Sequence, residues 1–359
     1  MTHEHNPSGQ PTVSPLRYTS AAFIVVIAVI LTVLLAACAS TSVDAPDLTP
    51  VENEDLILTI SSGDHYTFPT TRADDPNHTG HQLRFTAWLY EEYNNGVVIS
   101  KDPTNLVRRV EQLATGGDNT VIFKNVPADK YYFVIVFADY IDADSRQDES
   151  GHYPDKYYDT LSDAEIIKLA ATHDEIFNNH NLDCFLFVST KTFRKEANKA
   201  VDITCNLTRM VSRIQVQANS SGSSAALKDI SVNKYSVISD LEIIGKSGRN
   251  LYNQSPSLTV TPADRASGLL LFYYTLNAYS SIPLQNTEFT LNPEEGYQFA
   301  NDGKYKIPGD NHQIVPEANY IYTVKGDFLN ITDQPAKTFD LSVSVDKEWE
   351  TPSKDIVIP

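Results

Sequence analysis

Positive charge is scarce in this sequence. It contains 28 Lys and Arg residues against 46 Asp and Glu residues, which gives a formal net charge of −18 at pH 7. A surface of this sign repels the phosphates of nucleic acids and of anionic lipids. We therefore exclude nucleic acid as a partner, and any attachment to a membrane must depend on something other than a basic patch.

Motifs that bind phosphate or calcium are also lacking. The Gly-Lys-Ser tripeptide at 245–247 would need a glycine at position 240 to form a phosphate loop, and Asp240 occupies that position. The acidic segment 142–153 begins like a calcium loop, but Gln147 and Tyr153 stand where such a loop needs a turn glycine and a bidentate glutamate. A solvated acidic loop is the better interpretation of this segment.

Catalytic and metal-binding patterns are equally scarce. His78 and His81 could meet a metal ion, but no third ligand is identifiable, which favours a polar loop. No zinc-protease helix or nucleophile elbow is found. Paired glycosidase carboxylates would leave no local signature. We predict a protein that is not an enzyme and that needs no metal or cofactor.

Long apolar runs are absent except for one. Residues 21–37 carry no charge over 17 residues, at the short end of the ~17–25 residues that span a bilayer. Arg17 precedes this run, and the small residues Ala36 and Ala37 end it as at a signal-peptidase site. We therefore expect residues 1–37 to be a signal peptide. The alternative is an uncleaved anchor helix.

The end of the apolar run reads LAAC, from Leu35 to Cys38, and it resembles the bacterial lipobox. In a lipobox the cysteine is acylated and becomes the new N-terminus. The resemblance implies a palmitate-bearing lipoprotein modified at Cys38, with Leu35, Ala36 and Ala37 recognised by the signal peptidase. It also implies attachment to the outer membrane through acyl chains, since the surface offers no basic patch.

Cysteine is rare, with three residues in the whole sequence. If Cys38 carries lipid, Cys184 and Cys205 remain, with 20 residues between them and each in a strand-like run. A disulfide between them would stabilise the protein by about 3 kcal/mol if the strands are neighbours. Two buried free thiols are the alternative.

The residues after the signal peptide favour β-structure. Residues 38–54 are polar and contain proline, as expected of a tether. Runs rich in β-branched and aromatic residues then follow at 55–60, 81–90, 119–126, 130–140, 183–190, 200–218, 268–279, 286–292, 319–329 and 338–349. A low-complexity break at 218–229 divides them. We predict a mainly β protein with two tandem β-sandwich domains, residues 55–217 and 218–359.

One segment departs from the β pattern. Residues 161–180 open with Ser162 and Glu165 at the spacing of a capping box, and apolar residues recur at helical spacing behind them. We predict one short helix here, packed over a sheet of the first domain. His173 falls on its apolar face and is expected to be a packed residue and not a ligand.

The order of these elements resembles the FimA-type fimbrillins, the pilin subunits of Bacteroidales-type Gram-negative surfaces. The lipobox cysteine is followed by DLILTISSG, by an arginine in TTRADD, and by HQLRFTAWLYEE. The stretches YYFVIVFADY, LSDAEIIKLA and LTRMVSRIQVQA come next, and EANYIYTVKGDFL and FDLSVSVDKEW lie near the end. The resemblance spans residues 35–359.

The resemblance implies two sandwiches of transthyretin-like topology and a maturation step. In that family an arginine-specific protease removes the N-terminal strand, and the C-terminal strand of another subunit fills the gap. The matching cleavage site lies between Arg72 and Ala73. The matching donor-strand residues are Phe339, Leu341, Val343, Val345 and Trp349. The implied partners are other fimbrial subunits, of the same or a paralogous kind, and a host or bacterial surface receptor.

Two simpler interpretations stay open. The strand at 338–349 could pair within its own domain, and Arg72 could be an ordinary surface residue. An uncut chain would then be an anchor-type or monomeric outer-membrane lipoprotein that binds glycan or acts as an adhesin. A glycan platform would draw on the aromatic residues Trp88, Tyr90, Tyr131, Tyr132, Tyr273, Tyr274 and Tyr279.

Overall fold

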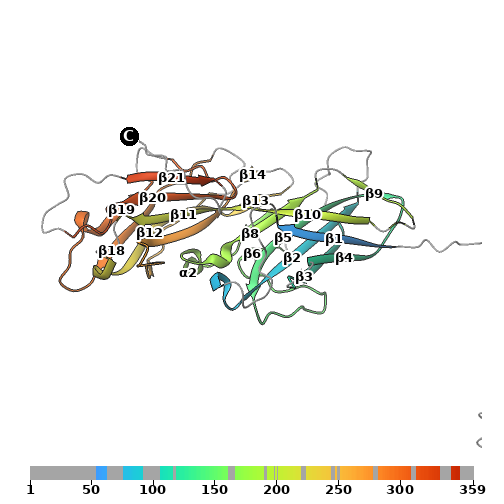
Figure 1. Ribbon diagram of the computed structural model, residues 1–359, viewed down its shortest axis with the longest axis horizontal. Coiled ribbons are helices and arrows are strands. Elements are labelled where there is room, and N and C mark those ends of the chain that lie inside the picture. The colour runs from blue at the N-terminus through green and yellow to red at the C-terminus, as the bar shows by residue number, and fades with distance from the viewer. Residues whose placement is uncertain are drawn as a thin grey trace, which may run out of the picture. The chain divides into compact units, whose positions relative to one another are not determined.

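The fold was analysed in a computed structural model of the chain. The structure describes residues 54–62, 76–91, 106–115, 119–160, 166–189, 192–197, 199, 201–219, 224–243, 247–248, 251–277, 282–308, 313–331 and 341–347. Nearly all regular structure within these ranges is β-strand, and the predicted mainly β fold with sandwiched sheets is confirmed (Figure 1). Among the described residues, no helix is long and apolar enough to cross a membrane. The apolar run 21–37 lies outside these ranges.

The first half of the described chain forms an eight-stranded sheet that folds over on itself. Its strands run in the order β3-β2-β5-β8-β10-β1-β4, with β9 paired to the start of β5. They are β1 (Glu54–Ser62), β2 (His81–Glu91), β3 (Leu106–Leu113), β4 (Asn119–Val126), β5 (Lys130–Asp142), β8 (Cys184–Val188), β9 (Phe193–Lys195) and β10 (Val201–Arg209).

Strand β10 connects two layers because it pairs with a strand of each. Its last residues, Thr208 and Arg209, pair with β8, whereas 201–207 pair with β1. The layer β10-β1-β4 therefore faces the layer β3-β2-β5-β8. Along β10 the even-numbered residues from Asp202 to Thr208 are exposed, whereas Cys205 and Leu207 are buried, as the alternation in the sequence predicts.

The second half forms two further sheets that face each other. One has the order β17-β11-β20-β21, and the other has the order β15-β12-β18-β19 with β16 also on β12. Their strands are β11 (Val211–Ala218), β12 (Leu227–Ile238), β15 (Leu251–Gln254), β16 (Leu258–Val260), β17 (Leu269–Leu276), β18 (Thr287–Pro293), β19 (Lys304–Ile307), β20 (Tyr320–Gly326) and β21 (Leu341–Lys347).

Met210 separates β10 from β11, and β11 pairs with β17 and β20 of the second half. The division into two domains stays a prediction, and these pairings would place its boundary at Met210 and not after residue 217. Part of the predicted linker 218–229 is already ordered, because Ser224–Ala226 form the 3-10 turn η4 and β12 begins at Leu227.

The predicted helix over 161–180 is wrong in its extent. Residues 161–165, with the proposed capping box, lie outside the described ranges, and Ile166–Leu169 form the strand β7. The only helix among the described residues that is not a 3-10 turn is α2 (His173–Ile176), which a capping box of Thr172 and Glu175 begins. Strand pairing overrides the helical periodicity here.

The pairing partner of β7 is distant in sequence. A small sheet with the order β14-β13-β7-β6 joins β6 (Tyr158–Asp159) and β7 to β13 (Asp240–Glu242) and β14 (Ser247–Gly248). The described 3-10 turns η1 (Pro76–His78), η3 (His180–Leu182) and η5 (Ala300–Gly303) complete the fold. Phe177, at the end of α2, forms a bridge to Tyr273 of β17, so the segment around α2 is held by the later sheets.

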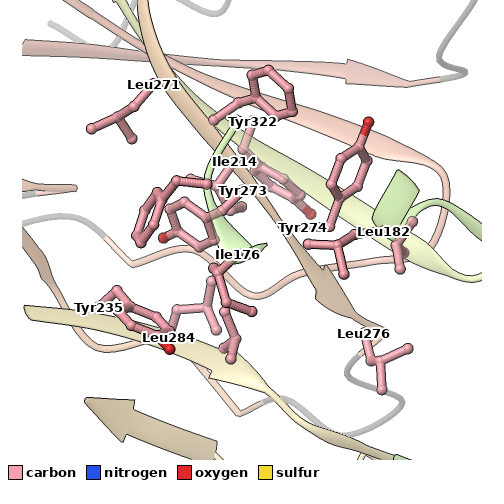
Figure 2. Close-up of a cluster of buried hydrophobic side chains, with 14 of the residues drawn as sticks. Ile176, Leu182, Ile214, Tyr235, Leu271, Tyr273, Tyr274, Leu276, Leu284 and Tyr322 are labelled. Atoms are coloured by element: carbon pink, nitrogen blue, oxygen red, sulfur yellow. The ribbon is translucent and has the colours of Figure 1, made fainter. Parts of the chain in front are cut away.

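Two hydrophobic clusters fill the described part of the molecule. The first lies between the two layers of the eight-stranded sheet and includes the inward residues of β1, β2, β4 and β5. The second fills the space between the later sheets and receives Ile176 and Leu182, which lie among Tyr235, Tyr273 and Leu276 (Figure 2). His173, as expected, is a packing residue, whose Nδ1 lies 2.7 Å from the Tyr235 hydroxyl.

Candidate functional site

Strand β1 occupies a slot between two other strands. It runs parallel to β10, with Leu58 opposite Ile203, and antiparallel to β4, with Leu58 opposite Val121. Its backbone is therefore hydrogen-bonded on both sides. Removal of β1 would leave two rows of unpaired N–H and C=O groups facing each other.

The inward side chains of β1 are almost completely buried. Leu56 and Leu58 are 0% exposed and Ile60 is 5% exposed. Burial of such a side chain contributes about 1.5–3 kcal/mol relative to exposure. The three residues together make β1 a major part of the first hydrophobic cluster, and the slot without them would be a deep apolar trough.

The floor of this slot comes from β2 and β5. Because side chains alternate along a strand, every second residue of β2 points toward β1. These residues and their counterparts on β5 are all buried: Leu83, Phe85, Ala87, Leu89, Val134, Val136 and Ala138. The floor is therefore dry and aliphatic, as an incoming strand with alternating apolar residues would require.

The rim of the slot is polar. The Thr59 hydroxyl donates to Asp202 Oδ1 at 2.9 Å, and Lys124 Nζ lies 2.6 Å from Asp55 Oδ2. The Asn125 amide also donates to Asp55. The hydrogen bond from Lys124, followed by that from Asn125, holds the pKa of Asp55 below its usual value. These contacts fix the register of β1 against its neighbours.

The segment predicted to be the donor strand lies in its own sheet. Leu341–Lys347 form β21, which pairs antiparallel with β20 and has no second neighbour among the described strands. Val343 is 8% exposed and Val345 is half-buried against the second cluster. Phe339 and Trp349 lie outside the described residues, so this part of the donor prediction has no structural counterpart.

Comparison with protein families assigns the chain. The model of a family described as "Family of unknown function (DUF6562)" matches residues 49–359. The chain belongs to this family. The DUF6562 match covers the slot, the floor and β21, and a search of curated proteins found no match.

Solved structures resemble this DUF6562 chain only distantly. A fimbrial assembly protein from Parabacteroides distasonis ATCC 8503 is 13% identical, with 84% of this chain and 98% of that chain covered at a TM-score of 0.40. The fimbrial anchor protein Mfa2 from Porphyromonas gingivalis is 11% identical, with 82% and 97% covered at a TM-score of 0.42. Likenesses this distant carry no function over to the DUF6562 chain, and the FimA-type resemblance stays a prediction.

Several predicted processing residues fall outside the described ranges. They are Leu35, Ala36, Ala37 and Cys38 of the lipobox, and Arg72 and Ala73 of the cleavage site. In the sequence, Arg72 lies between the end of β1 at Ser62 and the start of η1 at Pro76. Three arginines that follow Arg72 in the sequence lie within the described ranges: Arg108 and Arg109 lie within β3, and Arg146 is exposed in a loop.

The two described cysteines do not form a disulfide. Cys184 and Cys205 are both free and buried, the first in the second cluster and the other in the first cluster. Burial raises the pKa of the Cys205 thiol to about 12 and also raises the pKa of Cys184. Because the two side chains lie in different hydrophobic clusters, no disulfide joins them in this structure, and their placement agrees with the alternative of two buried free thiols.

The aromatic residues considered for a glycan platform are mostly core residues. Trp88, Tyr90, Tyr132, Tyr273 and Tyr274 are all buried. Tyr131 is exposed, at 47%, and Tyr279 lies outside the described residues. A platform of the proposed kind is therefore not formed, because the strands turn these rings into the two clusters.

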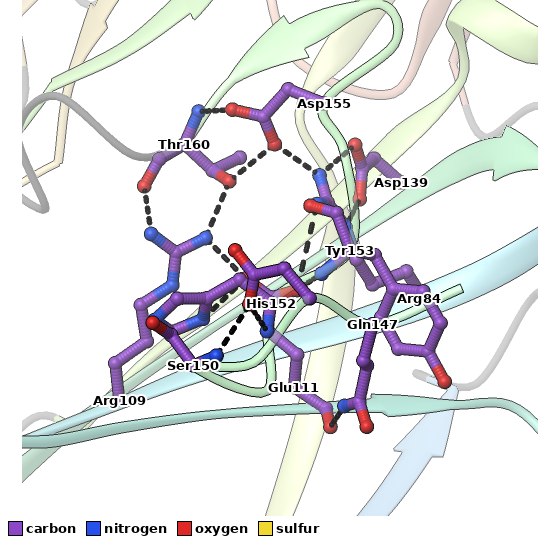
Figure 3. Close-up of polar contacts among 11 residues, drawn as sticks. Arg84, Arg109, Glu111, Asp139, Gln147, Ser150, His152, Tyr153, Asp155 and Thr160 are labelled. Carbon is purple, nitrogen blue, oxygen red and sulfur yellow. Dashed lines mark hydrogen bonds and ion pairs between the residues drawn. The ribbon is translucent and has the colours of Figure 1, made fainter. Parts of the chain in front are cut away.

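A buried charge network lies on the other face of the floor (Figure 3). Arg84 donates two hydrogen bonds to Asp139, at 2.9 and 2.8 Å, and contacts Asp155 at 2.9 Å. Arg84 and Asp139 are both 0% exposed. Sequence reasoning missed this network, although Arg84 between Leu83 and Phe85 in a strand-like run was a usable signal for a buried partner.

The same network fastens the acidic loop to the sheet. Glu111 accepts a hydrogen bond from the Tyr153 amide at 2.7 Å, and Arg109 donates to Thr160 O and Oγ1, both at 2.9 Å. Within the loop, the His152 amide is the main cause that lowers the pKa of Asp148. The Asp148 carboxylate is thus used for backbone contacts within the loop.

The two histidines considered as metal ligands have other contacts. His78 stacks on Tyr140 with ring centroids 3.6 Å apart, and His81 Nε2 lies 2.8 Å from the Tyr157 hydroxyl. In the part of the chain that the structure describes, no cluster of three or more His, Cys, Asp or Glu residues is placed to hold a metal ion. Strand pairing in the β1 slot is therefore the best-supported chemistry of the site.

Proposed function

We propose that this chain is an exported lipoprotein subunit of a cell-surface fimbria that assembles by strand exchange. A cut between Arg72 and Ala73 would release β1, and the β21 segment of another subunit would enter the slot. The proposal rests on one observation above all. The described strand that precedes the proposed cut is paired on both sides and covers a dry apolar floor.

An empty slot would be energetically unfavourable. Loss of β1 would expose the inward faces of two layers and leave unpaired backbone groups on β4 and β10. An incoming strand with alternating apolar side chains would restore the backbone pairing and the buried surface together. A cut sandwich is consequently a strong acceptor for the end of another chain.

The N-terminus of the chain isolated from the cell surface tests this proposal. We expect mass spectrometry to find a chain that begins at Ala73 and that forms a ladder of SDS-resistant oligomers. Arg72→Ala should abolish both. Arg146→Ala is the matched control, because Arg146 is exposed in a described loop and contacts only backbone oxygens of Asp144 and Ser145 there. An acylated Cys38 in every copy, without oligomers, would contradict the proposed role as a subunit of the fimbrial shaft.

A second candidate rests on the pairing of β21 with β20 in its own chain. An uncut, monomeric or anchor-type outer-membrane lipoprotein would keep β1 in its slot, and β21 would stay paired with β20 of the same chain. We expect Cys38→Ser to abolish palmitate labelling and membrane association of the uncut chain. Labelling that persists in this variant would contradict the lipoprotein assignment.

A further inference from the structure

Strands β1 and β21 follow one sequence pattern. Residues 55–61 read DLILTIS and residues 340–346 read DLSVSVD. Both begin with Asp-Leu, place aliphatic residues at the second, fourth and sixth positions, and have a hydroxyl residue at the fifth. Two positions differ in kind: the third, with Ile57 in one and Ser342 in the other, and the seventh, with Ser61 and Asp346. A strand of this pattern can fill the slot with the same face turned inward.

The polar rim of the slot distinguishes one register from the others. Lys124 meets the carboxylate at the first position, Asp55, and Asp202 accepts from the hydroxyl at the fifth, Thr59. With residues 340–346 in the place of 55–61, Asp340 would meet Lys124 and Ser344 would meet Asp202. The polar contacts of Asp55 and Thr59 would be reproduced. Asp346 would take the place of Ser61, whose hydroxyl donates to Asn206 in the uncut chain, so this contact would change.

Shifts toward the C-terminus are penalised. A shift of one residue would turn Ser344 into the apolar floor, because a strand has a period of two. A shift of two residues would place Asp346 beside Asp202, which brings like charges together. It would also put Lys347 in the place of Ile60, which is 5% exposed.

A shift in the other direction is also unfavourable. With 338–344 in the slot, Phe339 would take the place of Leu56, which is 0% exposed, and the larger ring would overpack that position. Lys124 would then face Thr338 and lose its carboxylate partner. The register that aligns 340–346 with 55–61 is therefore the one that the slot favours.

Ser344 supplies a separate argument for exchange. In its own sheet Ser344 is 4% exposed, and within the described part of the chain its hydroxyl has no hydrogen-bond partner. A buried hydroxyl without a partner is unfavourable. In the slot of β1, the equivalent hydroxyl of Thr59 has the carboxylate of Asp202 as its partner.

We propose that the slot accepts a second copy of this chain, with residues 340–346 in the register of 55–61 and with Lys124 and Asp202 as the residues that select it. This inference rests on the proposed function. Val343 and Val345 are each one methylene smaller than Leu58 and Ile60, so β1 fills the slot better than its replacement. Exchange therefore follows the release of β1 and does not compete with it.

Cysteine cross-linking between two copies tests the register. Thr59 lies opposite Thr204 on β10, so Ser344 of the second copy would lie there after exchange. We would mix full-length Thr204→Cys chains with full-length Ser344→Cys chains, cut both with an arginine-specific protease, and oxidise them. Neighbouring strands lie ~4.8 Å apart, within the reach of a disulfide. We expect a disulfide-linked dimer of the two variants.

The matched control uses Ser342→Cys in place of Ser344→Cys. Both serines lie on β21, but Ser342 would sit two residues away from Thr204 and should not cross-link. A cross-link through Ser342→Cys, or through a residue of 348–359, would overturn the proposed register and leave strand exchange standing. A preparation of this chain alone, cut at Arg72, should also form oligomers. If it stays monomeric although chains from the cell surface begin at Ala73 and form SDS-resistant oligomers, the partner is not a second copy of this chain.

Charge reversal at the rim provides an independent measurement. Lys124→Asp would face Asp340 with a like charge and should lower the oligomer fraction by up to about five-fold, the usual range of an exposed pair. Asp340→Lys in the same chain should restore it. If Lys124→Asp changes nothing, Lys124 does not select the strand. If surface chains start at Cys38 and never form oligomers, the proposed function itself fails.

Discussion

Strands β1 and β21 have nearly the same pattern of side chains but different surroundings. Strand β1 has a neighbour on each side, and its inward residues are 0–5% exposed. Strand β21 has one described neighbour, β20, and Val343 is 8% exposed while Val345 is only half-buried. The position in the sheet, more than the small difference in side-chain size, decides how much each strand contributes to stability.

This difference indicates a direction for exchange. An edge strand can leave its sheet with the loss of one row of backbone hydrogen bonds, whereas an interior strand leaves two rows unpaired. A copy of β21 that enters the β1 slot gains a second neighbour and a fully buried inward face. The slot is thus the more favourable position for either strand once it is vacant.

The largest expected effect concerns the floor that both strands would share. Arg84→Met leaves the Asp139 carboxylate buried without its main partner, and we expect a loss of about 3–5 kcal/mol in the free energy of unfolding. Urea denaturation measures it. The control is Arg84→Met with Asp139→Leu, which removes both charges and should be much milder. Equal losses in the two variants would show that the ion pair does not support the floor.

The next effect compares the two strands directly. Leu58→Ala removes a side chain that is 0% exposed and should lower the free energy of unfolding by about 2–5 kcal/mol. Val343→Ala removes two methylenes at 8% exposure and should cost only about 1–2 kcal/mol. Thermal or urea unfolding of both variants gives the difference. A cost for Val343→Ala that equals that of Leu58→Ala would contradict the unequal packing of the strands.

A smaller effect separates the hydroxyls at the fifth position. Thr59→Val removes the hydrogen bond to Asp202 and should cost about 0.5–1 kcal/mol, the lower part of the range because the pair is exposed. Ser344→Ala removes a buried hydroxyl that has no partner in the described structure, and should be neutral or stabilising. If Ser344→Ala is the more costly of the two, Ser344 already has a partner and the argument from its hydroxyl fails.

Much of the fold follows from the sequence because the alternation of apolar and polar residues in a strand predicts which of its faces is buried. All ten predicted strand runs contain strands of the structure, including β1, β2, β5 and β17. The helix over 161–180 was overestimated because long-range pairing of β7 with β13 leaves no local signal. Strand β12 was missed because the Ser-rich segment before it reads as a linker, although its residues Ile230 and Val232 are buried.

The candidate site divides in the same way. The alternation of Leu56, Leu58 and Ile60 predicts an apolar inward face, and the structure confirms that face. The polar partners of β1 could not be predicted, because Asp202 lies more than 140 residues away and is brought close only by the parallel pairing with β10. The state of the cysteines also depended on which layer each strand joined.

The smallest effect concerns Asp55, at the start of β1. Its pKa in the folded chain is lowered, first by the hydrogen bond from Lys124, so the contact stabilises the fold above the pKa of the unfolded chain. This stabilisation is lost as the pH falls through the folded-state pKa, below about pH 4. NMR titration of the carboxyl should show the lowered pKa, and Lys124→Met should return it toward the ordinary value. After exchange the same titration should move to Asp340 of the incoming copy, because Lys124 stays with the acceptor. An ordinary pKa for Asp340 in the oligomer would indicate that another residue occupies the first position of the slot.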